Sequence, residues 1–318
     1  MLGKASAVID KAALSPVRIP DDAVKIIAVT PAVLFGVAIF RLQAVEFLAL
    51  ALAAGLLAHL AARIAGWKGA NPVAAALISV VVVGPAAPIL LVAACALGTV
   101  ILELLRARFL SKASIQIGLL IYVVVLLASR GAIASYTDPF GGSAHVEPIR
   151  FWHQFFPADA APIDPVRLYV GNLAGPVFAT SLLMAVIGAA VFWYTRRMSP
   201  VVLAGFLIGA LVPIYFFHWN AVFQLDSGPA WLVASLVLAD RSTLPGGLTR
   251  PFIGIAAGLS GFAVRHQGAG IEGVFVAIAA TQLFVAAIEG AVWLQRNRSD
   301  LGSAFHLATQ THLSRADS

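Results

Sequence analysis

The sequence has little of what a water-soluble protein of its size needs. Only 11% of its 318 residues are charged, whereas soluble domains carry about 25%. Apolar residues make up 60% of the chain, and the mean hydropathy is +0.91. No folded sphere could bury so many apolar side chains, because even a domain of about 300 residues needs a polar surface. This composition excludes soluble enzymes and disordered chains and makes lipid the main solvent.

Cysteine and the common catalytic signatures are also scarce. The single cysteine, Cys95, excludes an intramolecular disulfide and is interpreted as a small buried hydrophobe. No HExxH, GxSxG or Walker A pattern occurs, and the seven histidines are scattered. His145 and His153 share a polar segment with Asp138 and Glu147, where a solvated loop is favoured over a metal site.

Ten apolar runs predict membrane-spanning segments, since a helix crosses the hydrocarbon core in about 20 residues and in fewer where it is broken. The runs cover residues 24–40, 44–65, 71–83, 85–105, 113–129, 168–194, 199–217, 228–239, 251–264 and 271–294. We therefore predict an all-α integral membrane protein of about ten helices. Its parts are an N-terminal tail (1–23), a five-helix half (24–129), a polar segment (130–167), a second five-helix half (168–294) and a C-terminal tail (295–318). An odd number of helices in each half makes any repeat an inverted one.

The basic residues of the short loops orient the chain, because positively charged loops stay in the cytoplasm. If the chain crosses the membrane ten times, most basic clusters lie on one side of the membrane, together with both termini. This side carries Lys4, Lys11, Arg18, Lys25, Arg63, Lys68, Arg106, Arg108, Lys112, Arg196, Arg197, Arg241, Arg250, Arg296, Arg298 and Arg315. We expect a multi-pass protein of a bacterial inner membrane with both termini in the cytoplasm, and no nucleic-acid partner despite the net charge of +6.

The third segment of each half is short and bounded by proline and glycine. These segments cover residues 71–85 and 228–240. Short interrupted segments at matching positions indicate a site at the membrane midplane, although tilted spans give the same pattern. The pairs Gly205/Gly209 and Gly254/Gly258 predict close helix packing.

A few ionisable residues fall inside the apolar runs, where a charge is costly. Glu289 lies well inside the last run and is either functional or paired with a neighbouring helix. Glu103 and His59 lie near segment ends, where snorkelling to the interface accounts for them. The segment 130–167 is rich in aromatic residues, which predicts an interfacial helix or a docking face for another subunit.

The C-terminal third carries a series of motifs. A turn with Asp240, Thr243 and Pro245 leads to a helix that begins near Arg250 and ends at Arg265, and Gly273 opens the last helix. This order resembles the NqrB/RnfD family, membrane subunits of the sodium-pumping NADH:quinone reductase and of the Rnf complex. Gln282 and Glu289 stand where that family has Asn and Asp, and Thr180 and Ser181 match its Thr-Ser motif.

The resemblance implies a scaffold similar to urea-transporter-type channels and a role in an electron-transport complex. The chain is then at most a non-autonomous subunit of a membrane oxidoreductase, which meets its partner subunits through 130–167. The matched positions imply a set of pathway residues near the midplane. These are Asp240, Thr243, Gln282, Glu289, Thr180 and Ser181.

The sequence differs from the family at the flavin attachment site and at two other polar motifs. Relatives carry FMN esterified to the threonine of a Ser/Thr-Gly-Ala-Thr motif in the outer loop, and this threonine falls on Ala144 here. An alanine cannot form the phosphoester, and Thr137 or Ser143 could replace it only by a register shift. Ala179 stands for the family's glutamate, and residues 112–116 replace its Phe-Asn-Pro-Ala motif. We expect FMN or riboflavin to be bound noncovalently, or no flavin.

Three functions are consistent with these features. The first is a redox-complex subunit without the usual covalent FMN. The second is a channel or transporter for a small solute or ion, formed where the two short segments meet. The third is a non-catalytic membrane anchor of a biosynthetic assembly.

Overall fold

The computed structural model describes residues 19–67, 69–110, 115–140, 143–155, 163–245, 247 and 249–296. Within these ranges the regular structure is helical, and two isolated β-bridges join Thr137 to Ala144 and Met198 to Asp240. The chain is an all-α membrane protein, as predicted. Residues 1–18 and 297–318 lie outside the described residues, so the location of the two tails remains a prediction.

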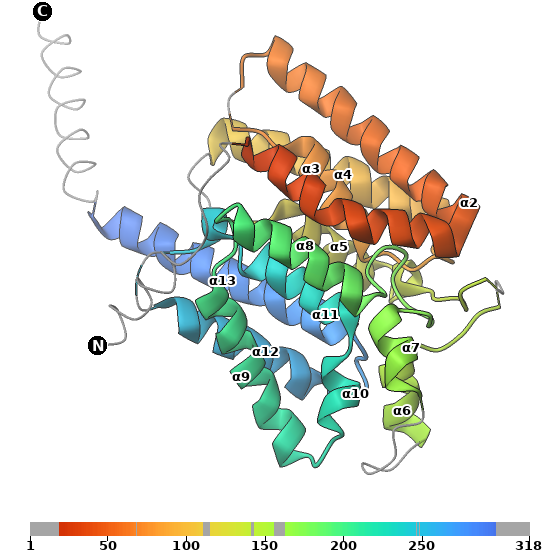
Figure 1. Cartoon of the computed structure of the whole chain (residues 1–318). Coiled ribbons are helices and arrows are strands. Elements are labelled where there is room, and N and C mark those ends of the chain that lie inside the picture. The colour runs from red at the N-terminus through yellow and green to blue at the C-terminus, as the bar shows by residue number, and fades with distance from the viewer. Residues whose placement is uncertain are drawn as a thin grey trace, which may run out of the picture.

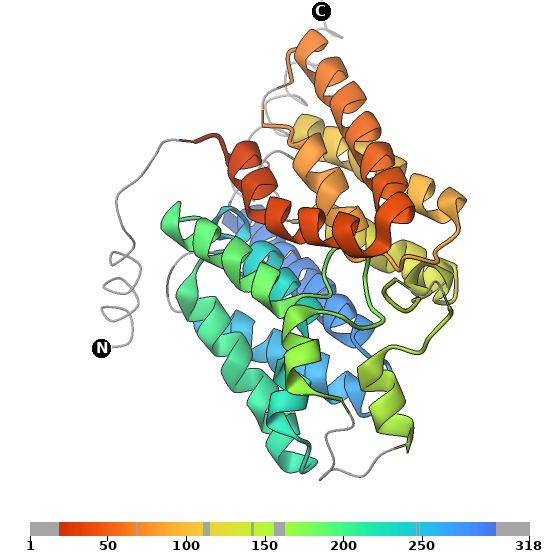
Figure 2. The same cartoon turned by 45° about the vertical axis from the view of Figure 1, so that its right-hand side comes forward.

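The first half consists of five helical segments. Helix α2 is kinked at Arg41, where φ is 49°, so it forms two limbs that match the predicted segments 24–40 and 44–65; Figure 2 shows the two limbs at an angle. Proline begins α3 at the first helical position, where no backbone donor is lost. The helices are α2 (Asp21–Ile64), α3 (Pro72–Val81), α4 (Ile89–Phe109) and α5 (Ile117–Ala128).

The second half also has five long or broken helices. Helix α11 continues without interruption into the π-helix η2, so this short segment is irregular within itself. The helices are α8 (Leu182–Tyr194), α9 (Pro200–Phe216), α11 (Gly228–Val233), η2 (Ala234–Leu238), α12 (Thr249–Arg265) and α13 (Glu272–Arg296). Three short elements precede α8, namely η1 (Ala132–Ala134), α6 (Pro148–Phe155) and α7 (Pro165–Val170). Two more, α10 (Ala221–Leu225) and η3 (Arg241–Thr243), lie between the later helices.

Several helices have the length and composition of membrane spans. Among the described residues, α2, α4 and the part of α13 from Glu272 to Val292 are long and apolar enough to cross a membrane. Shorter apolar helices are α3, α5, α8, α9 and the α11–η2 segment. The chain is therefore a multi-pass membrane protein, with five predicted spans before the polar segment and five after it.

The predicted span 168–194 is not one helix. Helix α7 ends at Val170, Gly171 has a φ of 89°, and regular helix resumes only at Leu182. In between, the amides of Val177 and Phe178 donate to the carbonyls of Val83 and Val81 at 2.7 and 3.3 Å. The last carbonyls of a helix lack intrahelical donors. The non-helical segment 171–181 supplies donors to the last carbonyl of α3 and to one just after it, and therefore does not continue as a helix.

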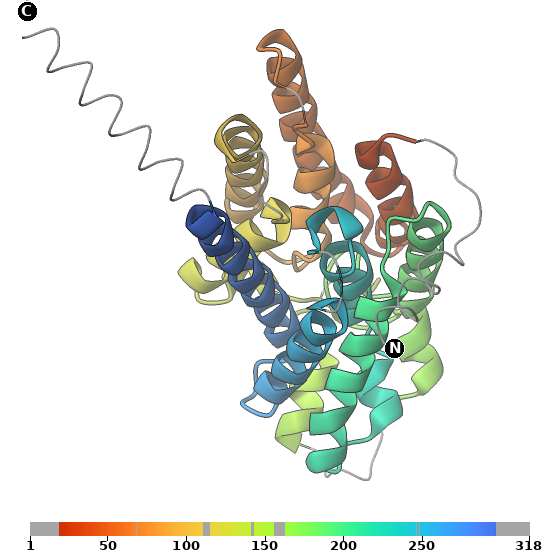
Figure 3. The same ribbon diagram turned by 90° about the vertical axis from the view of Figure 1, so that its left-hand side faces the viewer.

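The predicted glycine pairs bring α9 and α12 into close contact. A Cβ at Gly254 or Gly258 would overlap the carbonyl oxygens of Val202 and Phe206, and a Cβ at Gly209 would overlap that of Ile255. Helix α13 packs beside α12 on its other side, as Figure 3 shows. Close packing through small residues is thus confirmed at this crossing.

The polar segment contributes the short helices at one end of the molecule. Helices α6 and α7 lie at this end together with α10 (Figure 1). The two halves also meet along their length, where α5 contacts α13 and α2 contacts α8. Side chains from both halves therefore meet in the interior.

Candidate functional site

A buried ion pair joins the two halves near the start of α2. The carboxylate of Asp240, which is fully buried, lies 2.7 Å from the Lys25 ammonium. The Gln116 amide donates to the same carboxylate oxygen at 2.7 Å, and the Ser242 backbone N–H donates to the other at 2.9 Å. We call Lys25, Gln116 and Asp240 the Asp240 cluster. Every oxygen of this carboxylate has a partner from the chain itself, as a buried charge requires.

Local structure explains how these three residues reach one another. Asp240 precedes the single turn η3, and its side chain caps that turn by accepting from Ser242. Thr243 closes the turn by donating from Oγ1 to the Asp240 carbonyl at 3.0 Å. Gln116 is the residue before α5. Lys25, counted above with the cytoplasmic tail, is 9% exposed and lies within the bundle.

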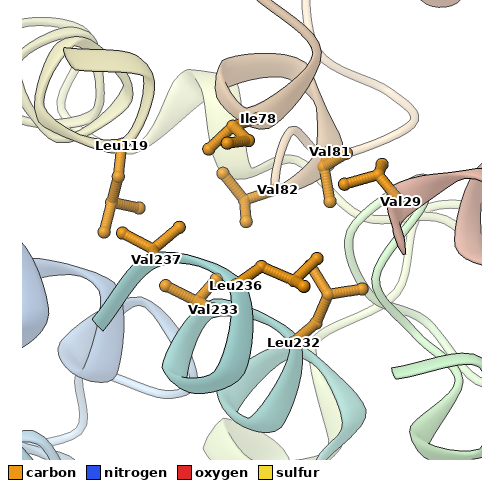
Figure 4. Close-up of a pocket in the computed structure, with 9 residues that line it drawn as sticks. All are labelled: Val29, Ile78, Val81, Val82, Leu119, Leu232, Val233, Leu236 and Val237. Atoms are coloured by element: carbon orange, nitrogen blue, oxygen red, sulfur yellow. The ribbon is translucent and has the colours of Figure 1, made fainter. Parts of the chain in front are cut away.

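An apolar layer follows immediately beyond the Asp240 cluster. The two short segments α3 and α11–η2 meet there and enclose a cavity of about 10 Å³, as Figure 4 shows. Its lining is Val29, Ile78, Val81, Val82, Leu119, Leu232, Val233, Leu236 and Val237. A space of this size is at the lower limit for one water molecule. The two short segments therefore meet, as predicted, and the space that they line here is small and apolar.

The two predicted polar residues of α13 lie in different surroundings. Gln282 is buried, and its side-chain amide donates to the carbonyl of Val237 in the π-helix at 3.1 Å. Glu289 lies two turns further along α13 and is half-buried. Among the described side chains, Glu289 forms no hydrogen bond or ion pair with the Asp240 cluster. Gln282 thus supports the broken helix, whereas the role of Glu289 remains a prediction.

Replacing Gln282 by leucine should destabilise the protein by about 1–2 kcal/mol, because the Val237 carbonyl loses its donor in an apolar environment. The measurement is the free energy of unfolding in mixed detergent–SDS micelles. Thr281→Ala is the matched control, since among the described residues the Thr281 hydroxyl donates to the Ala277 carbonyl of its own helix and to no other helix. An equal loss for both variants would contradict this role for Gln282.

Thr180 and Ser181 lie at the opposite end of the α11–η2 segment from Asp240. A Cβ at Gly228, the first residue of α11, would be 2.6 Å from the Thr180 carbonyl oxygen. Ser181 caps α8 by accepting from the Met184 N–H at 3.3 Å. Thr180 Oγ1 is buried and has no hydrogen-bond partner among the described residues. The structure therefore separates this pair from Asp240 and Thr243.

The predicted flavin positions fall on a small hairpin. Thr137 pairs with Ala144 across it, and the Asp138 N–H donates to the Ser143 carbonyl at 2.9 Å. Thr137 is buried, whereas Ser143 and Ala144 are exposed. An exposed ion pair joins His145 to Asp138 at 3.0 Å. The exposed hydroxyl here is thus Ser143, and position 144 carries only a methyl group.

A second buried polar group lies at the other end of the bundle, where the polar segment meets the second half. It consists of Glu147, Arg150, Arg265, Glu272 and Tyr136, which we call the Glu272 cluster. Glu147 precedes α6 and accepts from the N–H groups of Ile149 and Arg150 at 2.9 and 3.0 Å. Arg265 ends α12, and Glu272 begins α13. At about 1.5 Å per residue, α12 is about 24 Å long, and Arg265 is its last residue.

Arg265 holds the Glu272 cluster to α10. Its Nη1 donates to the side-chain and backbone oxygens of Gln224 at 2.9 and 3.1 Å. Its guanidinium lies 4.0 Å from the centre of the Phe262 ring, a favourable cation–π arrangement. Arg150 reaches Glu272 at 3.5 Å. Two arginines therefore face two glutamates in a largely buried space.

Burial changes the protonation of Glu147. Removal from water and, second, the negative charge of Glu272 raise its pKa from 4.5 to about 7, against the lowering effects of the two backbone donors and of Arg265. Burial also raises the pKa of Tyr136 well above 10, and the Glu272 charge acts in the same direction. Glu147 thus titrates near neutral pH, and Tyr136 stays a neutral donor.

Two expectations about individual acids are wrong. Glu147, assigned to a solvated loop, is only 4% exposed. Glu103, assigned to the interface by snorkelling, is also 4% exposed and accepts from Arg106 at 2.6 and 2.8 Å and from the Asn71 N–H at 3.0 Å. The three-residue spacing of Glu103 and Arg106, which places them on one face of a helix, was the feature of the sequence that indicated this ion pair. Cys95, by contrast, is the buried hydrophobe that its surroundings predicted.

The family model described as the NQR2, RnfD, RnfE family matches residues 23–296. This range contains both halves, both polar clusters and the segment between the halves. No curated protein sequence matches the chain.

Proposed function

Because the chain belongs to the NQR2, RnfD, RnfE family, we propose that it works as the membrane subunit of an electron-transport complex and carries no covalent FMN at residue 144. The observation that supports this role is the family match over residues 23–296, which covers both helical halves and the segment between them. The chain is proposed to meet partner subunits through 130–167, and lipid through its exposed apolar side chains. A bacterial inner membrane with both termini in the cytoplasm is part of the same proposal.

The residues of the hairpin do not fit a covalently attached flavin. Ala144 has no oxygen, and Thr137 is buried and paired across the hairpin. Ser143 is exposed but stands one position earlier, on the opposite side of an extended backbone. A flavin, if bound, is therefore proposed to be FMN or riboflavin held noncovalently.

The purified wild-type protein should show no flavin fluorescence after denaturing electrophoresis. The variant Ala144→Thr, made in a host that flavinylates such proteins, restores the missing hydroxyl and should become fluorescent to about one flavin per chain. Ser143→Ala is the control for attachment at the neighbouring position. A fluorescent wild type that loses its signal in Ser143→Ala would show attachment through a shifted register and overturn this part of the proposal.

Membership of a redox complex is tested separately. The protein is purified from native membranes in mild detergent, and the visible spectrum and the co-purifying chains are recorded. Other redox subunits, with flavin or iron–sulfur absorption, are the expected result. A chain that purifies alone and without a chromophore would contradict the role.

The alternative functions are a channel or transporter for a small solute or ion and a non-catalytic membrane anchor. The cavity between α3 and α11–η2 is small and lined by apolar side chains, so it offers a solute no polar group at this point. A flux assay on proteoliposomes with the wild type and Glu289→Gln separates the two alternatives. Flux that depends on Glu289 favours a transporter, and no flux in either protein favours an anchor.

A further inference from the structure

The Glu272 cluster contains a geometry that neither the family role nor the flavin explains. Gly270, with a φ of +57°, brings the chain between α12 and α13 against two carboxylates. A Cβ at Gly270 would lie 2.8 Å from Glu272 Oε2 and 2.9 Å from Glu147 Oε2. Both oxygens therefore lie within 3 Å of one point, so they are less than 6 Å apart. A like charge within about 4–6 Å disfavours the ionisation of a buried carboxylate.

The polar atoms around this point are incompletely hydrogen-bonded to one another. Among the described residues, both Glu272 oxygens and Nε and Nη2 of Arg265 lack a hydrogen bond of normal geometry. The Tyr136 hydroxyl lies near enough to Glu272 to interact with its carboxylate. Glu272, Tyr136 and Arg265 are 5%, 5% and 1% exposed. Within the part of the chain that the structure describes, Glu272 forms an ion pair with Arg150 at 3.5 Å. Buried polar groups that their neighbours satisfy incompletely are places where a proton or a small polar ligand such as water binds.

We propose that Glu147 and Glu272 share one proton and form a proton-binding site that joins the polar segment to α12 and α13. One carboxyl then donates its O–H toward the other carboxylate, directly or through water, and the proton exchanges with the solvent. Arg265 and Arg150 offset the single remaining negative charge, and Tyr136 donates to the free oxygens of Glu272. The inference does not depend on a bound flavin or on the partner subunits.

The titration of Glu147 agrees with this geometry. Its pKa of about 7 lies above the ordinary 4.5 because burial and the Glu272 charge disfavour the anion. A raised pKa of an acid means that the folded protein holds the proton between about pH 4.5 and 7, and that the stability from this proton is lost as the pH rises through 7. The groups facing Glu147 are Glu272 of α13, Arg265 of α12, Arg150 of α6 and Tyr136.

Infrared difference spectroscopy of the full chain in detergent tests the site. Spectra recorded from about pH 5 to about pH 9 in H2O and D2O follow the carbonyl band of protonated carboxyl groups. The wild type should lose one such band with a midpoint near pH 7. Glu147→Gln should abolish this transition, and Glu272→Gln should move its midpoint to lower pH, because the neighbouring negative charge is gone.

Two further variants serve as a second probe and a control. Gly270→Ala keeps both acids but places a methyl group between them, so it should shift the midpoint without removing the band. It also preserves the test if either glutamine variant fails to fold. Asp164→Asn changes an exposed helix-capping acid of the same segment and should leave the titration unaltered.

Three outcomes would overturn the proposal. The first is a wild type without a protonated carboxyl band that depends on Glu147. The second is a midpoint that is the same in Glu272→Gln and Gly270→Ala as in the wild type, which would make Glu147 an isolated acid. The third is a midpoint lowered by sodium chloride relative to choline chloride at equal ionic strength, which would assign the site to a metal cation.

Discussion

Replacing Gly258 by leucine is expected to force α9 and α12 apart and so to lower the free energy of unfolding. A Cβ at this position overlaps the Phe206 carbonyl oxygen, and the clash is with backbone that cannot rotate away. Helix α9 would have to separate from α12 along the whole crossing that Gly205, Gly209 and Gly254 also form. Overpacking in a tight interface costs about 3 kcal/mol, and more where backbone must move. The free energy of unfolding in mixed SDS micelles measures the loss.

Gly290→Leu is the matched control for this substitution. Gly290 is also within a helix, α13, but a Cβ there meets no atom within 4 Å. Because glycine is a poor helix former, leucine at this position should be neutral or stabilise the helix by up to about 1 kcal/mol. Equal destabilisation by both leucines would mean that the effect arises from added bulk in the membrane and that helix contact at Gly258 is unimportant.

Lys25→Met should destabilise the folded protein nearly as much as Gly258→Leu does, because it leaves Asp240 as a buried, unpaired charge. The ammonium lies 2.7 Å from a carboxylate with no solvent exposure. Removing one partner of a buried pair costs about 3–5 kcal/mol, most of it from the charge left behind. The loss should appear in the unfolding free energy and should be largely recovered by adding Asp240→Asn, which removes that charge.

The double variant separates the ion pair from simple packing. A coupling energy of zero in the cycle of Lys25→Met and Asp240→Asn would mean that the two side chains act independently. Arg197→Met is a control on a partly exposed pair, since Arg197 bonds to Asp21 at the edge of the bundle. Exposed pairs contribute up to about 1 kcal/mol, so this change should be small.

Local sequence features predicted the positions of most helices well. Apolar runs and Pro/Gly boundaries located α3, α9 and α11 to within a few residues, because proline at the first helical position and glycine at a turn act through their own backbone. The glycine pairs of α9 and α12 also gave the correct contact. The span 168–194 failed because its middle residues bond to the end of α3, a partner that no local pattern reveals.

Composition and periodicity by themselves therefore determined that this chain lies in a membrane, how many apolar segments it has and where most of them begin. Only the tertiary structure decided which charges are buried. Gln116 and Asp240 are 124 positions apart, yet they share a hydrogen bond beside Lys25. Glu147 of the polar segment and Glu272 of α13 are likewise far apart in the sequence. A charge can be buried only where packing brings its partners within about 3 Å, and that proximity is a property of the folded chain.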